Sequence, residues 1–214
     1  DAFAKYPDGV PYTIDVIDDP MEGMACRLEI TFDMPLYTTF GETGSVLNLG
    51  DDGLPEQNGT YPYAAAMFVP LAAQSSPAPL VVVGHGQLGT KEQVFGYREL
   101  WATYNLAGFG LDHKGFSSDD VPTVVESILG DLSTFRRIPE RMHQGHLNFL
   151  MAMRTLSREA EDAGSTLNET LQNDCGGAAL DGTKRYYFGG SQGGILGAVI
   201  MALGLDIERG LLAV

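Results

Sequence analysis

The 214-residue chain has few basic residues, few cysteines and no long apolar run. Lys and Arg together number 13 against 28 Asp and Glu, which gives a formal net charge of −15. A chain this acidic repels nucleic acid and other polyanions, so we expect no nucleic-acid partner and favour a neutral substrate. No stretch approaches the roughly 18 consecutive apolar residues of a transmembrane helix, so we expect no membrane span.

Only two cysteines, Cys26 and Cys175, are present. They could form one disulfide in an exported protein or remain two unrelated thiols, and the sequence favours neither alternative. The chain begins with Asp rather than Met, which indicates a processed start. Together with the acidic composition and a β-rich first region, this favours a secreted, periplasmic or cell-surface location.

Apolar patterning divides the chain into two regions. Residues 1–77 are β-rich, because residues 27–32 alternate polar and apolar side chains and residues 61–69 form a second strand candidate. Residues 78–214 alternate apolar strands with helical patterns, which predicts an α/β fold with a mostly parallel sheet flanked by helices. Within this second region, residues 158–183 are polar and acidic and predict an exposed excursion.

The most informative motif lies at residues 189–193, which read Gly-Gly-Ser-Gln-Gly, a G-x-S-x-G pattern. An apolar run at 186–188 precedes it and an apolar helical segment at 194–203 follows it. A serine at such a strand-to-helix turn is typical of a nucleophile elbow, in which glycines permit the crowded backbone. The motif predicts Ser191 as a nucleophile and the Gln192 N–H as a donor to a developing oxyanion.

A second glycine motif follows the first predicted parallel strand, where residues 84–89 read Gly-His-Gly-Gln-Leu-Gly. As G-x-G-x-x-G it matches the dinucleotide fingerprint, and Asp112 at the end of the next strand would be the ribose-binding acid. The spacing of 28 residues from Gly84 to Asp112 exceeds the usual value of about 20. An NAD(P)-binding oxidoreductase that uses the Gly84–Gly89 loop is therefore the alternative interpretation.

We favour an oxyanion loop at the same place. Acyl transfer needs backbone N–H groups that face the carbonyl oxygen as it gains charge. One donor is the residue after the nucleophile, and the other comes from the loop after an early strand, here Gln87. His85 and Gly86 would support that loop. One hypothesis then explains both glycine motifs.

With these motifs the chain resembles the α/β-hydrolase superfamily over about residues 78–214. His85-Gly86-Gln87 is similar to the His-Gly oxyanion loop of its lipases and esterases, and residues 189–193 match its elbow. The resemblance implies a serine hydrolase that cleaves small or polymeric carboxylic esters through an acyl-enzyme, with no metal or organic cofactor. The superfamily also includes serine peptidases and non-catalytic binding proteins, and these alternatives stay open.

One part of the superfamily pattern is absent after the elbow. The usual order is serine, acid, histidine, yet the 23 residues after Ser191 contain Asp206 and Glu208 but no histidine. We interpret these two acids as surface charges at a helix end. The hypothesis is that the fold is incomplete at the C-terminus. A segment beyond Val214, or a second C-terminal polypeptide, then supplies the acid and histidine, and the isolated chain is inactive.

Three upstream histidines are weaker candidates for the base or for a metal site. His113 ends a predicted strand at the correct edge of the sheet, but as a base it would break the usual order. His143 and His146 lie three residues apart on one helical face, a spacing that suits a metal. No third ligand is evident, so we interpret both as ordinary surface or core histidines.

Overall fold

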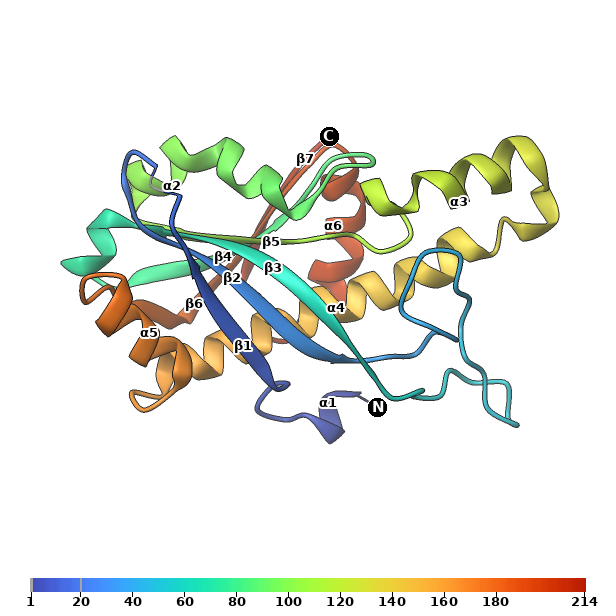
Figure 1. The fold of residues 1–214 in the computed structure, drawn as a ribbon, viewed down its shortest axis with the longest axis horizontal. Helices are drawn as coiled ribbons and strands as arrows, with labels where there is room; N and C mark the ends of the chain where they lie inside the picture. The colour runs from blue at the N-terminus through green and yellow to red at the C-terminus, as the bar shows by residue number, and fades with distance from the viewer. Residues whose placement is uncertain (1, 20) are drawn as a thin grey trace.

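The computed structural model describes residues 2–19 and 21–214, and Figure 1 shows one twisted sheet with helices on both faces. The strands are β1 (Tyr12–Ile17), β2 (Met24–Pro35), β3 (Thr60–Pro70), β4 (Ala78–Gly84), β5 (Ala107–Leu111), β6 (Leu180–Gly190) and β7 (Arg209–Ala213). The α-helices are α1 (Ala2–Lys5), α2 (Arg98–Tyr104), α3 (Val121–Val125), α4 (Arg137–Glu161), α5 (Thr166–Asp174) and α6 (Gln192–Leu203). The 3₁₀ helices are η1 (Leu71–Gln74), η2 (Lys91–Tyr97), η3 (Ser118–Asp120) and η5 (Leu132–Thr134), and η4 (Glu126–Gly130) is a π-helix.

The sheet is mixed, with the strand order β1-β2-β3-β5-β4-β6-β7. Strands β5, β4, β6 and β7 pair in parallel and form the predicted α/β core. Strands β1, β2 and β3 come from the β-rich region and continue the same sheet through antiparallel pairing, up to β3 against β5. The predicted α/β class with flanking helices is confirmed, and the antiparallel strands extend the parallel core on one side.

The two faces of the sheet are covered by different helices. All five residues of β5 are buried, as expected for a parallel strand that is covered on both sides. One face packs against α4, α5 and α6, with Phe149, Leu171 and Ile200 in its core. The other packs against η2 and α2, with Phe95 and Trp101 in its core. In Figure 1, α2 accordingly lies on the opposite side of the sheet from α4 and α5.

The predicted exposed excursion at 158–183 is wrong. Helix α4 continues to Glu161, and α5 places Leu167 and Leu171 fully inside the core. These two leucines lie four residues apart, so they form one narrow apolar stripe on an otherwise polar helix. The polar composition of the segment concealed that stripe.

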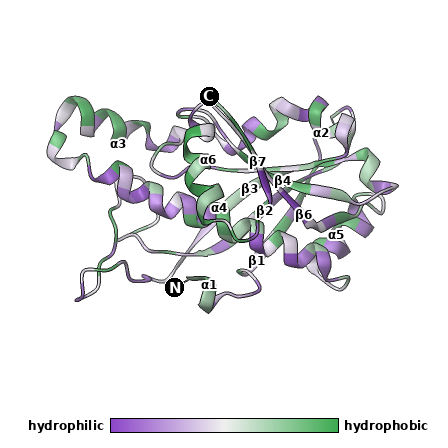
Figure 2. Cartoon of the chain, turned by 180° about the vertical axis from the view of Figure 1, so that it is seen from behind, coloured by the Kyte–Doolittle hydropathy of each residue, from purple (hydrophilic) through white to green (hydrophobic). Residues whose placement is uncertain are grey.

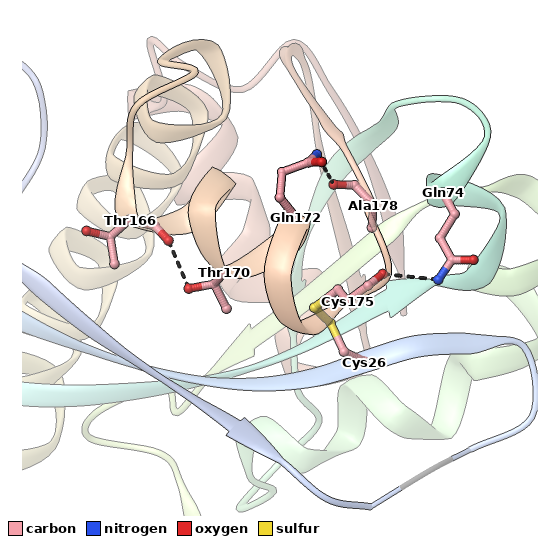
Figure 3. The surroundings of a disulfide bond; sticks show 7 residues. All are labelled: Cys26, Gln74, Thr166, Thr170, Gln172, Cys175 and Ala178. Atoms are coloured by element: carbon pink, nitrogen blue, oxygen red, sulfur yellow. Dashed lines mark hydrogen bonds between the residues drawn. A yellow bond between two sulfur atoms is a disulfide. The ribbon is translucent and has the colours of Figure 1, made fainter.

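A disulfide joins Cys26 in β2 to Cys175 directly after α5, across 149 residues of sequence. Both cysteines are buried. Figure 3 shows the bond between the strand and the turn after the helix, where the Gln74 side chain donates a hydrogen bond to the Cys175 carbonyl at 3.1 Å. The alternative of two separate thiols is thereby excluded.

Apolar side chains remain exposed beside β7 and on the projecting segment around α3. All five residues of β7 are exposed, and Ile195 on α6 is 54% exposed. In the α3 region, Leu129 and Leu132 are 81% and 70% exposed. Figure 2 shows both α6 and α3 as largely hydrophobic ribbons.

Among the described residues, no helix combines the length and apolar character that a membrane crossing requires.

Candidate active site

The G-x-S-x-G motif forms the turn between β6 and α6. Ser191 stands between the end of the strand and the first helical residue, and its side chain is exposed. Its backbone has φ 54° and ψ −120°, a conformation that residues other than glycine rarely adopt. Such strain persists only where the surroundings hold it, and it is concentrated at functional sites. The local geometry is that of a nucleophile elbow.

Two glycines make this turn possible. A Cβ atom on Gly189 would lie 2.3 Å from the carbonyl oxygen of Gly193. A Cβ atom on Gly193 would lie 2.1 Å from the carbonyl oxygen of Gly84, at the end of β4. Backbone occupies both positions, so no side chain can move aside to make room. The glycines therefore let the serine turn pack directly against the neighbouring strand.

Two hydrogen bonds hold the turn in place. The buried Tyr187 hydroxyl donates to the Gly193 carbonyl at 2.6 Å, and the Ser191 N–H donates to the Ala213 carbonyl at 2.7 Å. Burial raises the pKa of Tyr187, so the phenol stays protonated and remains a donor. The turn is thus fixed from β6 on one side and from β7 on the other.

The loop after β4 lies beside this serine. Gly84 and Gly189 are register partners in adjacent parallel strands, so the two loops leave the same edge of the sheet. A Cβ atom built on Gly86 would lie 3.8 Å from the Ser191 Cβ atom. The two glycine motifs therefore meet, as the oxyanion-loop interpretation requires.

His85 links this loop to the end of β5. Its Nε2 atom accepts a hydrogen bond from the His113 backbone N–H at 2.7 Å, so the proton of the neutral ring is on Nδ1. Nδ1 then donates to the Gly86 carbonyl at 2.7 Å. Burial lowers the pKa of His85, which favours this neutral form. Both ring nitrogens are engaged, so His85 has none free to accept a proton from Ser191.

Two backbone donors are left open at the site. Within the described residues, the N–H groups of Gln87 and Gln192 have no hydrogen-bond partner. The Gly86 carbonyl accepts from His85 and from the Gly89 N–H. The Gln87 N–H, in the same trans peptide unit, must therefore point the opposite way. The Gln192 N–H is the first of α6 and belongs to the group that a helix leaves unpaired.

Comparison with solved structures identifies this arrangement of sheet and helices. An acetyl xylan esterase from Paenibacillus sp. R4 aligns with a TM-score of 0.54 at 16% identity, over 95% of this chain and 53% of that chain. A structure assigned as an acetyl xylan esterase of Bacteroides fragilis NCTC 9343 aligns with a TM-score of 0.50 at 12% identity, over 96% and 48%. The chain has the α/β-hydrolase fold. It spans about half the length of these α/β-hydrolase structures. No family model and no curated protein sequence matches it.

On this α/β-hydrolase scaffold, the other histidines do not contact the serine. No hydrogen bond joins His113, His143 or His146 to Ser191 in the part of the chain that the structure describes. His113 is 1% exposed, stacks on Phe149 at 4.2 Å between ring centroids, and has no partner for Nε2 among the described residues. Burial, with His85 and His146 nearby, lowers its pKa well below the usual value. The ring is therefore neutral and packed as a core side chain.

One of the two acids after the elbow departs from the sequence interpretation. Asp206 is 9% exposed and forms an ion pair with Arg154 of α4 at 2.8 Å, so its interpretation as a surface charge is wrong. Glu208 is exposed, as the sequence interpretation predicts, and lies 3.6 Å from Arg185. Asp112 accepts a hydrogen bond from the Lys91 N–H at 2.7 Å and so holds the start of η2. That contact gives Asp112 a structural partner instead of a free carboxylate for a ribose.

Two polar contacts were missed from the sequence, one to the loop after β4 and one to the neighbouring segment 115–117. Gln93 on η2 accepts a hydrogen bond from the Gly86 N–H at 2.6 Å. Asp120 accepts from the Gly115 N–H at 2.8 Å and pairs with the buried Arg141, also at 2.8 Å. Burial raises the pKa of Asp120, but the Arg141 charge and the hydrogen bonds from Ser117 outweigh burial and lower it overall. Neither polar residue carries a periodic or motif signal, because a side chain that binds the backbone of a nearby loop leaves no pattern in the sequence.

Proposed function

We propose that this chain carries the nucleophile and oxyanion hole of a serine hydrolase that cleaves carboxylic esters. Ser191 attacks the ester carbonyl, and the N–H groups of Gln87 and Gln192 stabilise the resulting oxyanion. His85 and Gly86 hold the loop. The acyl group passes to Ser191, the alcohol leaves, and water hydrolyses the acyl-enzyme. The observation that carries the proposal is the strained, exposed Ser191 beside the loop after β4, together with the unpaired N–H groups of Gln87 and Gln192.

The proton acceptor is proposed to come from outside residues 1–214. A serine hydroxyl is a weak nucleophile unless a base takes its proton. His85 has both ring nitrogens engaged, and His113 is buried against Phe149. A histidine and its orienting acid on a segment beyond Val214, or on a second polypeptide, would complete the site. The exposed β7 and α6 offer a surface where such a segment could pack.

The disulfide adds a proposal about location. Disulfides persist in oxidising compartments and are rare in reducing ones. The Cys26–Cys175 bond therefore supports a secreted, periplasmic or cell-surface protein. The solved esterases share their fold with this chain. We propose a small or polymeric carboxylic ester as its substrate.

Fluorophosphonate labelling of the native protein, followed by peptide mapping, tests the proposal. The expected result is an adduct on Ser191 together with hydrolysis of p-nitrophenyl acetate, both lost in Ser191→Ala. Absence of labelling with detectable NAD(P) binding would favour the oxidoreductase alternative. A folded protein that neither labels nor hydrolyses would be a non-catalytic binding protein, and cleavage of peptide amides would indicate a peptidase.

A further inference from the structure

Gln93 makes direct contact with the oxyanion loop. Its Oε1 atom accepts the Gly86 N–H at 2.6 Å. Because a backbone N–H must face an oxygen, this contact assigns the Oε1 and Nε2 ends of the amide. Nε2 lies 3.9 Å from a Cβ atom built on Gly86. Nε2 has no hydrogen-bond partner within residues 2–19 and 21–214, and Gln93 is exposed. The Gln93 side chain therefore binds the loop through Oε1 and leaves its Nε2 donor without a partner.

The backbone under Gln93 is rigid. The Lys91 N–H is held by Asp112 at 2.7 Å, and the Gln93 N–H donates to the Thr90 carbonyl at 3.1 Å. Val94 and Phe95, which follow directly, are 0% and 7% exposed and belong to the core on this face of the sheet. Gln93 is thus presented from a packed element, and only its side chain has freedom to move.

Gln93 and Ser191 flank the same glycine. A Cβ atom built on Gly86 would lie 3.8 Å from the Gln93 Oε1 atom and 3.8 Å from the Ser191 Cβ atom. Glycine has the most backbone freedom of any residue, so this part of the loop depends on external contacts for its geometry. His85 fixes the Gly86 carbonyl, and Gln93 fixes the Gly86 N–H. Both sides of the residue before Gln87 are therefore tied to rigid elements.

We propose that Gln93 is a positioning residue of the oxyanion hole, an inference that rests on the proposed ester hydrolysis. Its hydrogen bond engages the Gly86 N–H and leaves the Gln87 N–H as an unpaired backbone donor of the loop. Its Nε2 donor lies beside Gly86 and has no hydrogen-bond partner among the described residues. Preorganised donors stabilise the transition state more than the bound substrate, so Gln93 acts on kcat rather than on KM.

Kinetics of the intact native protein with p-nitrophenyl acetate test this role. Gln93→Met keeps the length of the side chain and removes the acceptor, and we expect kcat to fall about 10-fold with KM changed less than about 2-fold. Glu99→Gln, on the exposed surface of the adjacent α2, is the matched control and should keep the wild-type constants. Thermal unfolding of each variant accompanies the kinetics.

Gln93→Glu separates positioning from a purely structural tether. A carboxylate still accepts the Gly86 N–H, but it places negative charge beside the developing oxyanion and removes the open donor. We expect its kcat at pH 8 to be at least as low as that of Gln93→Met. The ratio of its kcat to that of the wild type should rise as pH falls toward 5, since the free pKa of Glu is about 4.3.

Three results would overturn the inference. They are a wild-type kcat in Gln93→Met, a loss that appears in KM or in thermal stability instead of kcat, and a pH-independent ratio for Gln93→Glu. If the wild type hydrolyses the ester and labels at Ser191 while Gln93→Met does so equally well, only the role of Gln93 fails. If the wild type is inert and unlabelled, the proposed function fails as well.

Discussion

The two flanks of Ser191 differ in how completely they are built. On the β4 flank, the side chains of His85 and Gln93 hold Gly86, backbone hydrogen bonds hold residues 88 and 89, and the Gln87 N–H is left open. On the β7 flank, the strand is exposed along its length, and its hydrogen bond to the serine within the described residues is the one that the Ala213 carbonyl accepts from the Ser191 N–H. The comparison separates two requirements of the proposed reaction. Backbone donors for an oxyanion can be fixed by local packing, as on the β4 flank. Proton transfer needs a side chain beside the serine, and the described residues of the β7 flank supply none.

The largest effect should come from a side chain added where the elbow packs against β4. Gly193→Ala places a methyl group against the Gly84 carbonyl, where a Cβ atom would lie at 2.1 Å. We expect a loss of about 3 kcal/mol or more in the free energy of unfolding, together with loss of Ser191 labelling. Urea denaturation measures the first and fluorophosphonate labelling the second. Gly96→Ala is the matched control, because a Cβ atom built there would have no atom within 4 Å. Wild-type stability in Gly193→Ala would contradict the crowding argument.

A smaller effect should follow when the β4 flank loses its histidine link. His85→Ala removes the donor to the Gly86 carbonyl and the acceptor of the His113 N–H. We expect kcat for ester hydrolysis to fall roughly 10- to 100-fold, because the Gln87 N–H loses its fixed direction. His85→Gln can restore one of the two contacts and should recover part of the rate. The exposed His143→Gln on α4 serves as control, and an unchanged kcat in His85→Ala would refute the link.

Acid should destabilise the folded chain through its buried histidines. Burial lowers the pKa of His85, of His113 and of His146, the last to about 4. An unfolded histidine titrates near 6.5, so between about pH 6.5 and 4 the unfolded chain binds more protons than the folded chain. The free energy of unfolding should therefore fall as pH decreases through this window. Denaturation at pH 7.5, 6 and 5 measures the slope, which His146→Gln should reduce. A stability that does not change with pH would contradict this assignment.

The smallest effect concerns the strain at the serine itself. Ser191→Gly relieves a φ of 54°, whereas Ser191→Ala retains it. We expect the glycine variant to be more stable than the alanine variant by about 1 kcal/mol, although both lack the nucleophile. Ala198→Gly, at an exposed position inside α6, should instead destabilise by a similar amount. Equal stability of the two Ser191 variants would show that the turn stores no strain.

Local patterns predicted most of the fold, because each depends on residues close in sequence. The apolar runs predicted β4, β5 and the end of β6, and the helix predicted after Ser191 is confirmed as α6. The glycines of both motifs were visible for the same reason, since a crowded turn needs glycine wherever it occurs. The catalytic roles of Ser191, Gln87 and Gln192 stay predictions.

Contacts between distant segments could not be predicted in this way. Cys26 and Cys175 lie 149 residues apart, and their pairing depends on how α5 meets β2. Asp206 looked like a surface charge because its partner, Arg154, lies 52 residues earlier on another helix. Gln93 has a partner only seven residues away, but a glutamine in a helical stretch carries no signal that it will bind the backbone of a loop.

The cross-link between β2 and the turn after α5 has a consequence for proteolysis. It closes a covalent ring that contains the oxyanion loop, while Ser191 lies outside the ring. A protease that cuts once in the exposed stretch at 126–135 would separate the peptides that carry these two parts, yet the sulfur bridge would keep them in one molecule. The fragments would migrate together on a gel until a reductant is added, so a nicked protein could pass as an intact one.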